Sequence, residues 1–162
     1  MNSEILLALE NIVGSAYIFT DDPTRNTYGH DETEDLSFPP QVVVKPANTF
    51  EVSEILKISN RYKIPTVPIG ARTGLSGGAL AIYGGIGISM ERFNKILEID
   101  ERNLQITTEP GVITQVLREA VAEIGLLYPV DPSSMGSCWI GGNIAENSGG
   151  ARALKYGVTK DY

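Results

Sequence analysis

The segment from Pro68 to Ala79 combines glycine with hydroxyl side chains directly after an apolar stretch that predicts a strand. Its glycines are Gly70, Gly74, Gly77 and Gly78. Glycine adopts positive φ at no steric cost and lets a ligand lie against the main chain. Successive N–H groups in such a turn form a concave site for an anion. With Thr73 and Ser76 as further donors, the segment predicts a cradle for a diphosphate.

Two better-known phosphate motifs do not fit this segment. No Gly-Lys-Ser/Thr run follows, which excludes a P-loop, and the glycine spacing differs from the dinucleotide fingerprint of the Rossmann fold. A glycine-rich connection between two strands, with no ligand at all, is the structural alternative. Glycine content alone leaves both interpretations open.

A second glycine-rich stretch, residues 136–150, follows the turn-rich run from Tyr128 to Ser134. Its glycines are Gly136, Gly141, Gly142, Gly149 and Gly150. Two such stretches in a short chain suggest a long ligand that touches the main chain at several points.

Hydrophobic periodicity predicts the elements that position these stretches. We expect helices over 3–13, 48–62 and 114–124, and strands over 42–44, 64–67 and 86–90 with a hairpin over 96–100 and 104–109. Asn48 and Glu51 have the spacing of a capping box. The predicted inward faces of the two later helices are Val52, Ile55, Leu56, Ser59 and Tyr62, and Val116, Leu117, Ala120, Val121 and Ile124.

The order of these elements predicts an α+β fold. A strand, a helix and a second strand suggest a βαβ unit with parallel strands. Residues 20–40 are acidic and rich in turn formers, which predicts a surface loop leading into the domain. We therefore expect a small mixed sheet flanked by helices, with 1–39 as an N-terminal helix and acidic leader and 40–162 as the main domain.

Composition narrows the classes of partner. The 162 residues carry a net charge of -7 and no block of Lys or Arg, so the chain is a poor candidate for binding nucleic acid. No stretch is apolar for long enough to span a membrane. The single cysteine, Cys138, cannot form an internal disulfide, which favours the cytoplasm.

Taken together and in this order, the two glycine-rich stretches resemble the FAD-binding domain of FAD-linked oxidases of the vanillyl-alcohol oxidase and p-cresol methylhydroxylase type. Within that family they are most similar to the glycolate oxidase flavoprotein subunit and to D-lactate and D-2-hydroxyglutarate dehydrogenases. The resemblance covers roughly Pro40 to the end. It implies FAD as cofactor and a small 2-hydroxy acid as substrate of the full-length enzyme. The residues it assigns to FAD are Gly70, Ala71, Arg72, Thr73, Gly74, Ser76, Pro132, Ser133, Gly136, Ser137, Gly141, Gly142, Asn143, Ala145 and Asn147.

Departures from the family pattern refine these expectations. Members that attach FAD covalently through the first loop place histidine where Thr73 stands, so the resemblance implies a non-covalent flavin here. The family often has arginine at the position of Ile69 and glycine at that of Arg72, which puts the local shape of the loop in question. Trp139 is bulkier than the residue expected at this position. Two roles of its indole are open, packing near the flavin and anchoring the chain as a core or surface residue, and the anchoring role is favoured.

No residue of this chain is predicted to be catalytic or to bind a metal. His30 lies in the acidic leader and Cys138 has no base near it in sequence. Asp131, Glu146 and Asp161 have commoner roles in turns and caps. We expect the chain to be a truncated piece of an enzyme, with substrate residues downstream and exposed apolar edges that could promote self-association. An FAD domain of a sugar or alcohol oxidase, and a non-catalytic nucleotide-binding module, are the alternatives.

Overall fold

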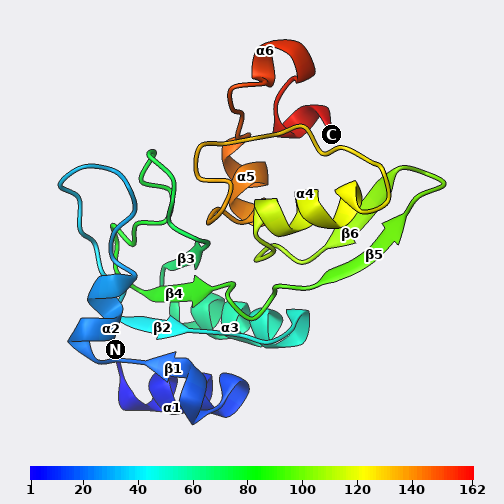
Figure 1. Cartoon of the computed structure of the whole chain (residues 1–162). Helices are drawn as coiled ribbons and strands as arrows, with labels where there is room; N and C mark the ends of the chain where they lie inside the picture. Colours follow the sequence, from blue (N-terminus) through cyan, green and yellow to red (C-terminus); the bar gives the residue numbers. More distant parts are fainter. The chain divides into compact units, whose positions relative to one another are not determined.

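The helices and strands form two units, Met1–Arg92 and Phe93–Tyr162, and the computed structural model describes all residues from 1 to 162 (Figure 1). The first unit contains α1 (Ser3–Val13), η1 (Ser15–Tyr17), β1 (Ile18–Phe19), α2 (Asp22–Thr27), β2 (Val42–Val44), α3 (Thr49–Tyr62), β3 (Thr66–Ile69) and β4 (Ile86–Ser89). The second contains β5 (Ile96–Asp100), β6 (Gln105–Thr108), α4 (Thr114–Ala122), α5 (Ile140–Glu146), α6 (Ala153–Tyr156) and η2 (Thr159–Asp161).

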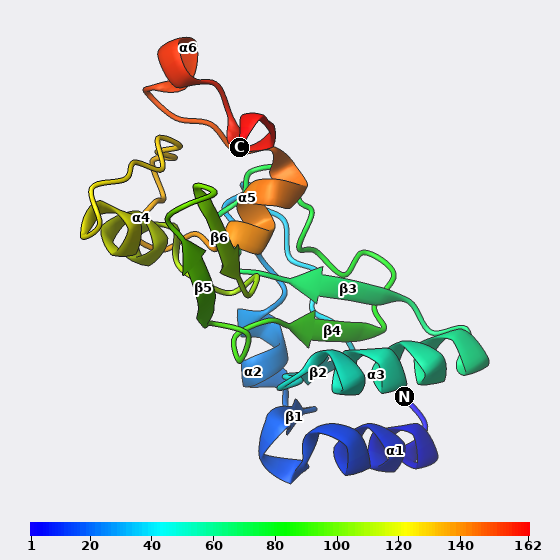
Figure 2. The same ribbon diagram turned by 90° about the vertical axis from the view of Figure 1, so that its right-hand side faces the viewer.

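A four-stranded mixed sheet in the order β1-β2-β4-β3 organises the first unit. β1 is antiparallel to β2, whereas β4 is parallel to both β2 and β3 (Figure 2). The predicted βαβ unit is confirmed. β2 precedes α3 and β3 follows it in the sequence, and both strands run parallel to β4 and hence to each other. β4 lies between them in the sheet, so the first glycine-rich loop, which connects β3 to β4, joins neighbouring strands.

The two faces of this sheet bury different clusters because side chains alternate along a strand. Val42 and Val44 face α1 and α3 and pack with Ile55. Val43 points to the opposite face, where it packs with Tyr28 and with Ile69 of β3. All three valines are fully buried, as expected for a strand covered on both sides.

Helix α3 begins at the predicted N-cap, Asn48, but only half of the predicted capping box forms, because the Glu51 carboxylate accepts from the N–H of Ala47 and not from that of Asn48. The Asn48 side chain accepts from the N–H of Glu51. The predicted inward face is only partly right, because Ile55 is buried while Leu56 and Tyr62 are exposed. The helix packs on the sheet through a narrower stripe than its apolar residues suggested.

The prediction of a surface loop over residues 20–40 is wrong in two respects. Residues Asp22–Thr27 form helix α2, capped by the Asp21 side chain on the N–H of Thr24. Tyr28 and Pro40 are buried. The capping signal of Asp21 was present in the sequence, but the high density of acidic and turn-forming residues obscured it.

The second unit consists of the predicted β5–β6 hairpin with α4 and α5. The strands are antiparallel with an irregularity between Ile96 and Glu98, and Leu117 of α4 packs with Val112 and Ile140. The predicted inward positions Val116 and Ile124 are exposed. Helix α5 lies within residues 136–150, which the sequence had indicated as a glycine-rich loop.

Candidate functional site

The first glycine-rich loop leaves a run of main-chain donors unused. The N–H groups of Ala71, Arg72, Thr73 and Gly74 donate to no other group of the protein. Consecutive free amides in a turn are the chemistry of an anion-binding concavity. The loop therefore has unused main-chain donors that are available for an anion.

The left-handed residues of this loop are not those expected. Arg72 has φ 60° and Gly77 has φ 73°, whereas Gly70, Gly74 and Gly78 are not in the positive-φ region. A side chain at Gly74 would meet nothing within 4 Å, so its glycine leaves open space beside the free amides. The strained position falls on an arginine, at the place where the family often has glycine.

Segments before residue 40 brace this loop. The N–H of Glu32 donates to the carbonyl of Gly74 at 3.0 Å, and the N–H of Ala81 donates to the carbonyl of Phe38 at 3.2 Å. Gly29 packs so closely against Pro39 that a Cβ would lie 2.7 Å from the proline nitrogen. The leader is therefore part of the loop's support, which the sequence pattern did not reveal.

Arg72 lies over an aromatic ring from that leader. Its guanidinium carbon is 4.6 Å from the centroid of the Tyr28 ring. Nη1 of Arg72 is buried and has no hydrogen-bond partner. Nothing in the periodicity of residues 20–40 singled out Tyr28, because its partners lie far away in sequence.

Tyr28 is fixed in turn by an ion pair. Its hydroxyl donates to Glu91, which also binds Nζ of Lys45 at 2.7 Å. Burial raises the pKa of Tyr28, and the Glu91 carboxylate adds to that rise. Burial alone would raise the pKa of Glu91, but the hydrogen bonds from Lys45 and Tyr28 outweigh it and hold that pKa below its ordinary value. The carboxylate is therefore kept charged beneath the loop.

Several glycines of the second segment, residues 136–150, allow close packing of the main chain against other protein groups, unlike Gly74 of the first loop. A Cβ at Gly141 would lie 2.6 Å from Cβ of Pro110, and one at Gly150 would lie 2.0 Å from the carbonyl oxygen of Asp131. The N–H of Gly141 already donates to the carbonyl of Pro110. Gly142 differs, since it has open space around it and its N–H donates to no other group.

A buried polar cluster holds α5 against the start of α4. The side-chain amide of Asn143 donates to Oγ1 of Thr114 at 2.5 Å, and Oγ1 of Thr114 lies 3.2 Å from Sγ of Cys138. All three residues are buried. Asn143, which the family resemblance assigned to the cofactor, thus has its side chain engaged inside the second unit.

The other residues assigned to FAD in this unit lie nearer the surface. Those exposed are Ser133, Gly136, Ser137, Gly142, Ala145 and Asn147, and those half-buried are Pro132 and Gly141. Asn147 ends α5 at φ 51°, and its side chain accepts from the N–H of Lys160. Trp139 is half-buried and forms a bridge with Ile113, in keeping with an anchoring role.

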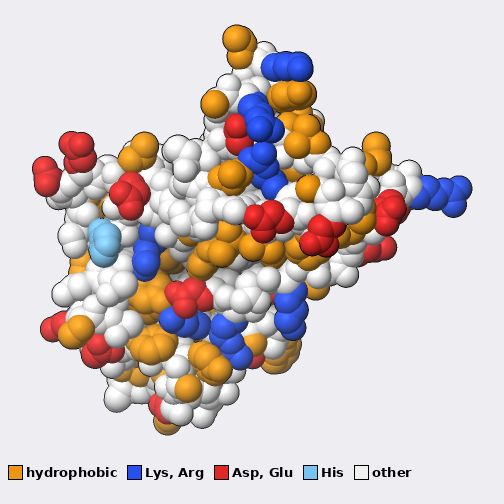
Figure 3. All heavy atoms as spheres, in the orientation of Figure 1, with side chains coloured by type: hydrophobic (Ala, Val, Ile, Leu, Met, Phe, Trp, Pro, Cys, Tyr) orange, Lys and Arg blue, Asp and Glu red, His pale blue; other side chains and the backbone are white.

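The residues weighed as acids, bases or nucleophiles have structural surroundings. His30 is exposed, and its Nδ1 lies 3.1 Å from the carbonyl of Asn26 (Figure 3). Asp131 binds the main-chain N–H and the guanidinium of Arg152. Cys138 is buried. No three His, Cys, Asp or Glu side chains are grouped to hold a metal.

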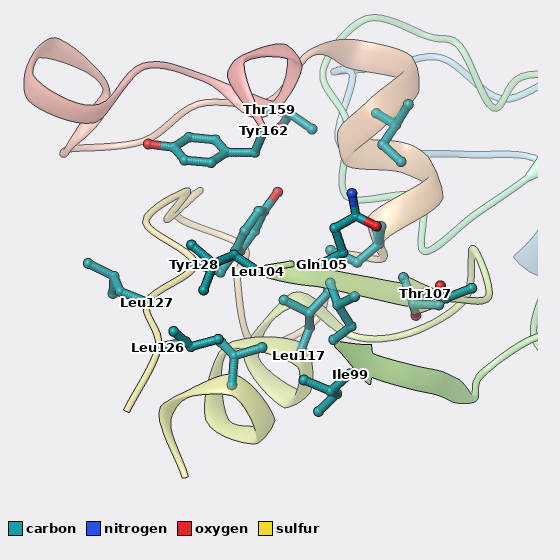
Figure 4. Close-up of a pocket in the computed structure, with 15 residues that line it drawn as sticks. Ile99, Leu104, Gln105, Thr107, Leu117, Leu126, Leu127, Tyr128, Thr159 and Tyr162 are labelled. Carbon is teal, nitrogen blue, oxygen red and sulfur yellow. The ribbon is translucent and has the colours of Figure 1, made fainter. Parts of the chain in front are cut away.

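A pocket of about 530 Å³ lies in the second unit between the hairpin and its helices (Figure 4). Aliphatic side chains such as Leu104, Leu117 and Leu126 form much of its wall. Tyr128 and Tyr162 meet edge to face at 5.9 Å near one end. None of the lining residues is acidic, basic or a histidine, so the pocket offers no group for proton transfer near neutral pH.

None of the helices has the length and apolar character needed to cross a bilayer.

The mixed sheet and the unused main-chain amides after β3 give a domain with a site suited to an anion such as a diphosphate. Residues 40–162 match the family described as FAD binding domain, and the chain belongs to that family. It is 50% identical over 138 residues to glycolate oxidase subunit GlcD of Bacillus subtilis, covering 85% of this chain and 29% of the relative. It is 38% identical to D-2-hydroxyglutarate dehydrogenase of Stutzerimonas stutzeri, covering 95% of this chain and 33% of the relative.

Another relative is D-lactate dehydrogenase of Anaerostipes hadrus, 46% identical over 123 residues, which are 76% of this chain and 26% of that one. Among solved structures, alkyldihydroxyacetonephosphate synthase matches with a TM-score of 0.88 at 22% identity, over 99% of this chain and 35% of that one. p-Cresol methylhydroxylase matches with a TM-score of 0.77 at 20% identity, over 90% and 29%. These structures confirm the expected fold, and the chain spans about a third of the length of such relatives.

Proposed function

We propose that this chain binds FAD without a covalent bond and forms the flavin-binding part of an enzyme that oxidises a small 2-hydroxy acid by hydride transfer to the flavin. The observation that carries the proposal is the run of unused main-chain N–H groups from Ala71 to Gly74. In a chain with net charge -7, such dipoles bind a diphosphate where basic side chains are few. FAD supplies the redox chemistry when bound, and the protein's part is to hold and orient it.

The assigned residues divide into two roles in this proposal. In the first segment Gly70, Ala71, Arg72, Thr73, Gly74 and Ser76 bind the diphosphate through main-chain amides and hydroxyls. In the second segment Pro132, Ser133, Gly136, Ser137, Gly141, Gly142, Asn143, Ala145 and Asn147 shape the main chain around the cofactor. Asn143 acts there by holding α5 in place, since its amide is bonded to Thr114.

The 2-hydroxy acid class rests on the relatives at 38–50% identity, which are named for glycolate, D-lactate and D-2-hydroxyglutarate. Oxidation of such a substrate needs a base for the hydroxyl proton and a cation for the carboxylate. The only histidine of this chain is exposed. We propose that these groups belong to the whole enzyme and not to residues 1–162, and that the enzyme works in the cytoplasm.

Titration of the purified chain with FAD tests the cofactor assignment. Binding is expected to shift the visible spectrum of the flavin, and acid precipitation is expected to release all of the colour, because Thr73 cannot form the bond that a histidine would. Colour that stays with the precipitate would contradict the non-covalent mode, and an unchanged spectrum would contradict FAD binding. D-Lactate or glycolate added without oxygen should leave the flavin of this chain oxidised; bleaching would contradict the placement of the catalytic groups.

A further inference from the structure

We propose that Tyr28 is a positioning residue for the first glycine-rich loop: its ring supports Arg72 in the left-handed conformation that presents the Ala71–Gly74 amides to a diphosphate. The inference rests on the proposed FAD binding and adds to it a residue outside the region matched by the family, which begins at residue 40.

Arg72 needs such support because its backbone is strained. A residue other than glycine is strained at φ 60°. A guanidinium over a tyrosine ring is attracted to the ring face, and this attraction grows when the pair is partly desolvated. The ring contact at 4.6 Å therefore offsets the strain and keeps Arg72 in this conformation. Without the ring, the arginine would relax and turn its neighbouring amides.

The ring can act as a support because it cannot move. Tyr28 is 6% exposed and packs with Val43 and Ile69 of the sheet. Its hydroxyl is held by Glu91, and Glu91 is held by Lys45. The ring is therefore tied to strand β2 through Val43, to β3 through Ile69 and to the end of β4 through Glu91.

Arg72 also lacks an acidic partner. Its Nη1 is buried with no acceptor, and buried donors of this kind need an explanation such as a bound ion. The nearby charge of Lys45 is already balanced by Glu91. A diphosphate oxygen would give Nη1 its acceptor, so the same contact that fixes the loop also places an unbalanced positive charge beside it.

A double-mutant cycle between Tyr28→Leu and Arg72→Gly tests the inference, with FAD and inorganic pyrophosphate as probes. Tyr28→Leu is expected to weaken FAD binding about tenfold, equivalent to about 1.4 kcal/mol. In the Arg72→Gly background it should have less than a twofold effect, because glycine adopts positive φ unaided. Tyr28→Phe keeps the ring and should retain most of the affinity.

Tyr62→Leu is the matched control. Tyr62 also lies under an arginine, with Arg61 at 5.4 Å from its centroid, but it is on α3 away from the loop. It should bind FAD as the wild type does. If Tyr28→Leu does not fold, Arg72→Ala replaces it: alanine is strained at this φ and cannot stack, so it should bind FAD more weakly than Arg72→Gly does.

Equal losses from Tyr28→Leu in both backgrounds, or equal affinities of Arg72→Ala and Arg72→Gly, would overturn the positioning role and leave FAD binding intact. A wild type that binds neither FAD nor pyrophosphate would overturn the proposed function itself. The two failures are therefore distinguishable in one set of titrations.

Discussion

The two glycine-rich segments look alike in sequence and differ in structure. Residues 70–78 form an irregular connection whose amides from Ala71 to Gly74 are unused. Residues 136–150 contain a helix, and the N–H groups of Ile140, Gly141 and Asn143 at its start are bonded to carbonyls of the second unit. Glycine serves ligand access in the first segment and close packing in much of the second.

This difference shows that glycine content does not by itself identify a binding loop. A glycine is required wherever the main chain approaches another group closely, whether that group belongs to a ligand or to the protein. Gly74 has nothing within 4 Å of its absent Cβ, whereas Gly150 would clash with Asp131. Unused N–H groups distinguish the two cases, and they can be found only in the folded chain.

The largest effect should come from Gly150→Ala. The new Cβ would lie 2.0 Å from the carbonyl oxygen of Asp131, and main-chain atoms cannot yield as a flexible side chain can. Overpacking of this kind costs about 3 kcal/mol. Urea denaturation should show that loss, while Gly74→Ala should change the free energy of unfolding by less than about 1 kcal/mol. Similar losses for both variants would remove the contrast between the segments.

Thr114→Val should destabilise the second unit by about 2 kcal/mol, because it leaves the buried amide of Asn143 without an acceptor. The shape of the side chain is kept, so the loss reports the hydrogen bond and not a cavity. Thr107→Val, at an exposed position of β6 with no side-chain hydrogen bond, is the control. A neutral Thr114→Val would mean that Asn143 is not needed to hold α5.

Acid should weaken the support beneath the first loop. Glu91 has a folded-state pKa below its ordinary value of 4.5, so its contribution to stability is present above about pH 4.5 and is lost as the pH falls through the lower, folded-state pKa. Its side chain is 35% exposed, which limits the effect to about 1 kcal/mol or less. When the denaturation midpoint of Glu91→Gln is measured as a function of pH, this fall in stability at acid pH should be absent. Glu54→Gln, which removes the pair with Lys57 on α3, should retain it.

Much of the fold was predictable because its signals are local. The valines of β2, the N-cap of α3 at Asn48 and the hairpin of β5 and β6 each depend on residues close together in sequence. Helix α5 was missed because Gly141 and Gly142 weaken helix propensity, while packing against Pro110 and Val112 stabilises it. Tyr28, Lys45 and Glu91 were missed for a related reason, since only the assembled sheet brings them together.

Gly142 provides the finest test of the comparison, because it is the glycine of α5 that resembles the first loop. Its N–H is unused and a Cβ would meet nothing within 4 Å. In an otherwise unaffected helix, Gly142→Ala should raise the free energy of unfolding by about 0.5–1 kcal/mol, whereas Gly141→Ala should lower it because of the contact with Pro110. FAD titration of Gly142→Ala then separates the two roles: weaker binding by a more stable protein means that this space is kept for the cofactor. Unchanged affinity would show that Gly142 is not needed for binding and that cofactor contacts in the second segment, if they exist, lie elsewhere.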